Sequence, residues 1–115
     1  MPVYSSFADR PEMAKLIPEF IEEAGRISHK LEKAVATEDV ETVRSFCRSL
    51  SGSGRNYGFD AVAAAAREAL KRLDATDSIP ATQTRLQHLL EICRCLRYDR
   101  ATASRDATER SEYAA

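Results

Sequence analysis

Apolar residues recur along this chain at steps of three and four, the spacing of one buried face of a helix. Four such runs follow one another, separated by short polar links. The inner faces that they predict are Ile17, Phe20, Ile21, Ala24, Ile27, Leu31 and Val35 in the first run, Val40, Val43, Cys47, Leu50, Gly54 and Tyr57 in the second, and Val62, Ala65, Ala66, Ala69, Leu70 and Leu73 in the third. In the last run, Leu86, Leu89, Leu90, Cys93, Leu96 and Arg97 follow one another along the predicted helix. No stretch carries a strand signal, so the pattern indicates helices throughout.

Capping and breaking residues mark where these helices begin and end. Asp9 is expected to cap a short helix that Pro18 interrupts, and the same proline can open the first long helix. Thr37 and Asp60 are the expected caps of the next two helices, with Gly58 as a stop signal between them. Because the links are short, each helix must return antiparallel to the previous one. The sequence therefore predicts an all-α fold, an up-and-down antiparallel four-helix bundle with a short extra N-terminal helix.

A chain of 115 residues is expected to form one domain. We assign residues 1–100 to a single helical bundle and residues 101–115 to a flexible C-terminal tail, because the tail has little to bury. Lys plus Arg is 17 and Asp plus Glu is 18, and this balance argues against nucleic acid as the main partner. The chain has no long apolar run and no basic-then-apolar signal pattern, so we expect a cytoplasmic protein with no membrane partner.

The residue types that usually carry chemistry are sparse. Cys93 and Cys95 are two apart on a predicted helix and point in different directions, so they cannot share a metal ion. Cys47 lies on a buried face, and we expect all three cysteines to be reduced. The glycines near the middle of the chain follow no strand and precede no Gly-Lys-Ser/Thr, so they form no phosphate loop. We therefore expect no metal, no cofactor and no small-molecule substrate.

The central helix contains two glycines, and each costs about 1 kcal/mol relative to alanine. Gly54 lies on the apolar face, where the close approach of another helix would explain it. Gly52 lies off that face, beside Arg48 and Ser51, so internal packing does not call for it. A bare backbone at Gly52 would let an external group come close.

The stretch from Arg44 to Phe59 resembles the signature of the histidine-containing phosphotransfer (HPt) domain. That signature reads His, any residue, Leu, Lys, Gly and small residues, with a further Gly ten positions after the His. The residues that match it are Leu50, Gly52, Ser53, Gly54 and Gly58. The resemblance covers roughly Tyr4 to Arg97 and implies the same four-helix bundle.

The resemblance also implies which chemical residues differ. Arg48 stands at the position of the phosphorylated His, and Ser51 stands at the position of the family's Lys. A guanidinium has no acceptor and stays protonated, with a pKa above about 12, so it cannot act as the nucleophile. We therefore expect a degenerate member that is not an enzyme. The family's usual partners are receiver domains of response regulators and histidine kinases.

A partner could dock on one helix stripe beside the buried face. The stripe consists of Arg44, Arg48, Ser51, Gly52 and Arg55. Three arginines on it could meet the acidic pocket around the phosphoacceptor Asp of a receiver domain. The alternative is a solvated helix face whose arginines pair with acids such as Glu41.

Two other functions stay open at this point. An active phosphotransfer protein could use His29, which lies about 3 Å from the level of Arg48 at ~1.5 Å per residue. Its spacing from the apolar residues puts His29 on the outer face, however, and His88 has no carboxylate in sequence reach to orient it. A helical interaction or dimerisation module outside phosphorelay is the second alternative.

Overall fold

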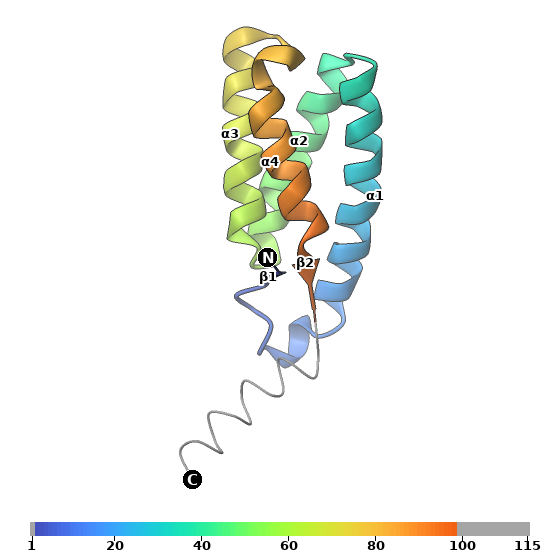
Figure 1. Ribbon diagram of the computed structural model, residues 1–115. Helices are drawn as coiled ribbons and strands as arrows, with labels where there is room; N and C mark the ends of the chain where they lie inside the picture. Colours follow the sequence, from blue (N-terminus) through green and yellow to red (C-terminus); the bar gives the residue numbers. More distant parts are fainter. Residues whose placement is uncertain (1, 99–115) are drawn as a thin grey trace.

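The computed structural model describes residues 2–98, so the predicted tail lies outside the described residues. Figure 1 shows four long helices that run alternately up and down around a common core. They are α1 (Leu16–Ala36), α2 (Val40–Asn56), α3 (Asp60–Thr76) and α4 (Ile79–Arg94). The predicted helical bundle is confirmed.

The core lies where the apolar periodicity predicts it. Six residues that we expected to be buried together are indeed buried: Ile27, Leu31, Val43, Cys47, Leu50 and Leu89. Leu70 was expected among them and is only half-buried, and so are four other residues of the predicted inner faces, Ile21, Val35, Val40 and Tyr57. All five pack against the buried core. The inner faces of all four helices thus form one apolar core.

The N-terminal segment differs from the expected short helix. It contains a single turn of 3-10 helix, η1 (Pro11–Met13), whose N-cap is Arg10 and not Asp9. The first long helix begins at Leu16, so Pro18 lies within its first turn. Backbone N–H groups in a first turn have no partner inside the helix, so a proline there removes no hydrogen bond. Pro18 therefore belongs to the opening of α1 and interrupts no helix.

Two predicted helix caps are also wrong. Asp39 rather than Thr37 caps α2, and its carboxylate accepts hydrogen bonds from the amide (3.2 Å) and the hydroxyl (2.6 Å) of Thr42. Thr37 instead ends α1, because its hydroxyl donates to carbonyls of the last turn. Phe59 occupies the N-cap of α3 without a side-chain hydrogen bond, and Asp60 lies in the first turn. An acidic side chain there still favours the positive end of the helix.

A short parallel pairing closes the open end of the bundle, which the sequence did not predict. β1 (Val3–Tyr4) pairs with β2 (Leu96–Arg97), in the register Val3 with Leu96. Two residues are too few to show an alternating pattern, so no strand signal was visible. The last helix consequently ends at Arg94, and Leu96 is buried from a strand rather than from a helix.

Candidate functional site

The position of Gly54 shows how closely α2 and α3 pack. A Cβ atom at Gly54 would lie 3.0 Å from the backbone nitrogen of Ala63 and 3.1 Å from the Cβ of Val62. Gly54 is buried, and so are both residues that it faces. A larger side chain would push the two helices apart, because the nearest atom belongs to a backbone that cannot rotate away. The predicted close helix approach at Gly54 is confirmed.

Gly52 has the opposite surroundings. It is exposed, and a Cβ atom there would meet no atom within 4 Å. Internal packing therefore does not explain a residue that costs about 1 kcal/mol within a helix. Gly25 on α1 is equally open and exposed, so openness alone does not mark a docking surface. What distinguishes Gly52 is its neighbours on α2.

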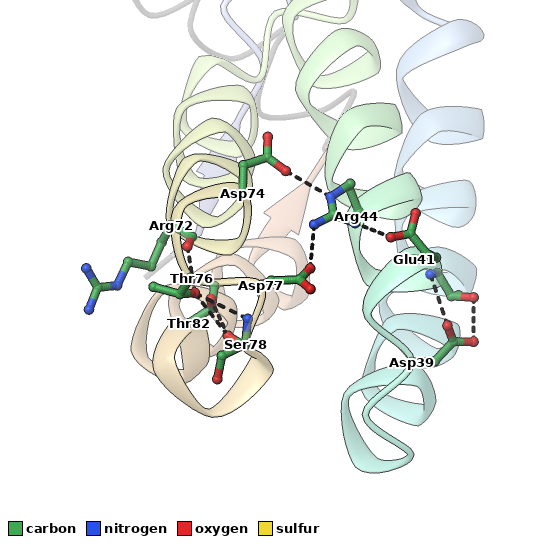
Figure 2. Close-up of polar contacts among 10 residues, drawn as sticks. Asp39, Glu41, Arg44, Arg72, Asp74, Thr76, Asp77, Ser78 and Thr82 are labelled. Atoms are coloured by element: carbon green, nitrogen blue, oxygen red, sulfur yellow. Dashed lines mark hydrogen bonds and ion pairs between the residues drawn. The ribbon is translucent and has the colours of Figure 1, made fainter.

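Arg44 lacks the exposure that the sequence predicted for every residue of the stripe. Its guanidinium contacts three carboxylates, with Nε 2.8 Å from Asp74, Nη2 3.0 Å from Asp77, and Nη1 against Glu41 (Figure 2). Only 13% of the side chain is exposed. The hydrogen bonds that Arg44 donates to Asp74 and Asp77 raise the pKa of Arg44 further above its ordinary value.

These contacts, which we call the Arg44 clamp, tie the first turns of α2 to the end of α3. Asp74 lies 30 residues from Arg44 along the chain and Asp77 lies 33. Asp77 is the C-cap of α3 and has a positive φ of 49°. The sequence indicated only Glu41 as a partner of these arginines. The short antiparallel link between α2 and α3 was the signal that could have indicated the other two.

The rest of the predicted stripe lies open on α2. Arg48, Gly52 and Arg55 are exposed, and Ser51 is half-buried. Neither Arg48 nor Arg55 forms an ion pair with any other residue in the range 2–98. The alternative of arginines paired with neighbouring acids therefore applies to Arg44, and not to these two within the described chain. Docking on this stripe stays a prediction.

The other side of α2 borders α1. An open hollow of about 380 Å³ lies there, lined by Glu19, Phe20, Glu22, Glu23, Arg26, Ser53 and Tyr57. The rings of Phe20 and Tyr57 stack in it, with centroids 4.9 Å apart. The Arg44 clamp faces α3, so the stripe that continues from it lies on the opposite side of α2 from this hollow.

This arrangement bears on both histidines. His29 is exposed on α1, as expected. His88 is exposed on α4 and lines a shallow hollow with Glu68, Thr84 and Arg85. Both histidines thus lie on helices other than α2, which carries Arg48.

The cysteines are buried to different degrees. Cys47 and Cys93 are buried, and Cys95 is half-buried. Burial raises the pKa of Cys47 to about 12 and also raises the pKa of Cys93. A thiol with so high a pKa stays protonated near neutral pH, which makes it a poor nucleophile and a poor metal ligand.

Residues 2–98 contain no group of three or more His, Cys, Asp or Glu side chains placed to hold a metal ion. Within the same range, no helix combines the length and the apolar character that a bilayer crossing needs.

Comparison with known proteins adds one finding to this geometry. Residues 15–99 match the model of the family described as Hpt domain, which covers all four helices. The comparisons with curated proteins and with solved structures found no match. The matched range is well over half of the 115 residues. The chain therefore belongs to the Hpt domain family.

Proposed function

We propose that this chain is an Hpt domain that has lost phosphotransfer and binds a receiver domain or a histidine kinase as a non-catalytic adaptor or competitor. Hpt domains take part in phosphorelay signalling, where they carry phosphoryl groups and interact with receivers and kinases. One observation carries the proposal. An exposed arginine, Arg48, stands where the resemblance to the family signature puts the histidine, beside an exposed glycine that the packing of the bundle does not need.

The chemistry at Arg48 supports the loss of phosphotransfer. Phosphoryl transfer to a histidine needs a neutral ring nitrogen that can attack the phosphorus atom. The guanidinium of Arg48 offers no such lone pair, since it stays protonated and only donates hydrogen bonds. His29 and His88 lie on α1 and α4, and not on α2 with Arg48. A chain with this arrangement keeps the docking surface of a phosphoryl carrier but lacks the histidine nitrogen that accepts the phosphoryl group.

The surface of α2 supports the docking role. Arg48 and Arg55 present positive charge, and Gly52 between them leaves the backbone open to close approach. The phosphoacceptor pocket of a receiver domain is acidic, so its charge is complementary to these two arginines. An ion pair at ~4 Å with an effective dielectric near 20 has a gross attraction of about 4 kcal/mol. Desolvation and side-chain ordering remove much of that energy, and we expect Arg48 to contribute about 1–2 kcal/mol to binding.

The test is titration calorimetry against a panel of purified receiver domains, with two matched pairs of variants. Gly52→Gln blocks backbone approach without changing charge, and Gly25→Gln makes the same change at the other open helical glycine. Gly25 lies seven residues before Glu32, which pairs with Arg94 of α4, so it faces away from α2. Arg48→Ala is matched by Arg85→Ala, which removes an exposed arginine of α4.

We expect the two α2 variants to weaken receiver binding by about tenfold or more, which corresponds to about 1.4 kcal/mol. Both control variants should bind as the parent protein does. Unchanged affinity for Arg48→Ala and Gly52→Gln would show that this face is not the docking surface. Failure of every receiver in the panel and of histidine kinase dimerisation domains to bind would contradict the proposed function itself.

A further inference from the structure

The Arg44 clamp fixes the level at which residues of α2 and α3 face each other. Arg44 of α2 contacts Asp74 of α3. Ser51 lies seven residues after Arg44, and Arg67 lies seven residues before Asp74. Seven residues are close to two full helical turns, so each residue keeps the side of its helix and moves about 10 Å along it. Because the helices are antiparallel, Ser51 and Arg67 arrive at the same level on the same side of the α2–α3 pair.

A second contact shows that the helices stay together beyond this level. Gly54 packs against Val62 and Ala63, about one turn past Ser51 and Arg67. The two helices are therefore in contact on both sides of the Ser51 level, and they cannot have diverged between the two contacts. Ser51 is half-buried at the edge of this seam, and Arg67 is exposed at its rim.

The charges along this seam are unevenly distributed. At one end, the Arg44 clamp gathers three carboxylates around one guanidinium. Toward the middle of the seam the exposed charges are Arg48 of α2 and Arg67 of α3, both positive, whereas the exposed Glu68 and Lys71 of α3 line a hollow with Arg85 of α4. Among the described residues, no carboxylate forms an ion pair with Arg48, Arg67 or Lys71. The middle of the seam is therefore a basic surface built from both helices.

We propose that Arg67 supplies, from α3, the positive charge that the family carries as a lysine at the position of Ser51. Arg67 would then be a positioning residue that holds the carboxylates of a receiver's acidic pocket against α2. A planar guanidinium can engage a carboxylate through two parallel hydrogen bonds, which a single ammonium cannot do. That the carboxylates belong to a receiver domain rests on the proposed function. The position of Arg67 beside Ser51 rests only on the register between α2 and α3.

The first test measures receiver affinity for Arg67→Ala, for the double variant Arg67→Ala with Ser51→Lys, and for Arg85→Ala as control. We expect Arg67→Ala to weaken binding about fivefold, as loss of a partly exposed ion pair does. Ser51→Lys should restore most of that loss, because it returns a cation to the same place from the other helix. Full affinity for Arg67→Ala alongside weakened binding by Gly52→Gln would overturn this inference and leave the proposed function standing.

A second test needs no partner. The imidazole of an Arg48→His variant serves as a reporter, and its pKa is read by NMR titration. A nearby cation disfavours the imidazolium, so we expect Arg67→Ala to raise that pKa by about 0.2–0.4 units at moderate salt. Adding Ser51→Lys should lower the pKa again, and Arg85→Ala should leave it unchanged.

If Ser51→Lys shifts the imidazole pKa of the reporter and Arg67→Ala does not, Arg67 lies too far from the site. That result would overturn the inference. An equal shift from Arg85→Ala would also overturn it, since the effect would then reflect net charge alone. The titration decides the place of Arg67 even where no receiver binds, so its result is separable from that of the proposed function.

Discussion

Replacing each of two neighbouring glycines of α2 with alanine should change stability in opposite directions. In an open helical position, glycine to alanine gains about 0.5–1 kcal/mol, because alanine loses less backbone entropy on folding. Gly52 meets this condition, since a Cβ atom there has no neighbour within 4 Å. At Gly54 the same Cβ atom would lie 3.0 Å from the Ala63 backbone nitrogen, and the helices must shift to admit it.

The size of the effect at Gly54 follows from two opposing terms. Overpacking a tight contact costs about 1–3 kcal/mol, against a propensity gain of about 1 kcal/mol. Gly54→Ala should therefore lower the free energy of unfolding by about 0–2 kcal/mol, while Gly52→Ala raises it. The difference between the two variants should be about 1–3 kcal/mol.

Urea denaturation followed by far-UV circular dichroism measures this difference, with Gly25→Ala as a second open-site control. We expect Gly25→Ala to behave as Gly52→Ala does, because both sites are exposed and empty. Equal stabilisation by Gly54→Ala and Gly52→Ala would refute the close packing of α2 on α3. It would also remove one of the two contacts that place Arg67 beside Ser51.

Three further outcomes follow from the structure. Leu50 is fully buried, so Leu50→Ala should lower the free energy of unfolding by about 2–5 kcal/mol, and a loss below about 1 kcal/mol in urea denaturation would contradict its core position. In the native protein at mildly alkaline pH, Ellman's reagent should modify the half-buried Cys95 before Cys47, whose pKa burial raises to about 12, and simultaneous reaction of both would count against the core. Hydrogen bonds from the Thr42 hydroxyl and amide lower the pKa of Asp39, so its cap stabilises the fold above the unfolded carboxyl pKa of about 3.9 and is lost as pH falls through the folded value. Asp39→Asn should flatten that acid limb of the stability curve, and an unchanged limb would show that the cap does not titrate there.

Much of the fold could be predicted from the sequence, because the helical periodicity of apolar residues can be recognised without knowing which other helices pack against them. The inner faces of the four helices, the glycine at the α2–α3 contact and the bundle itself follow from spacing and short links. The cap of α2 could not be predicted in this way. It depends on a positive φ of 54° at Glu38, which carries the chain past Thr37 to Asp39.

The candidate site was predictable along α2 and not across to α3. Spacing on one helix places Arg48, Gly52 and Arg55 together, and all three are exposed. The partners of Arg44 lie 30 and 33 residues away, so the register between helices had to be known before that arginine could be removed from the stripe. The same register places Arg67 of α3 beside the stripe on α2, and no sequence pattern within α3 indicates this position.

Loss of phosphotransfer with retention of the carrier frame is tested most directly by phosphorylation of the parent protein and of its Arg48→His variant. Each is incubated with a phosphorylated receiver domain and with a small phosphoramidate donor, and acid-labile phosphate is quantified. We expect no label on the parent protein and clear labelling of Arg48→His, because that change returns a ring nitrogen to an exposed position on an intact helix. Acid-labile phosphate on the parent protein that disappears in a His29→Gln variant would contradict the account and identify an active carrier with a relocated nucleophile.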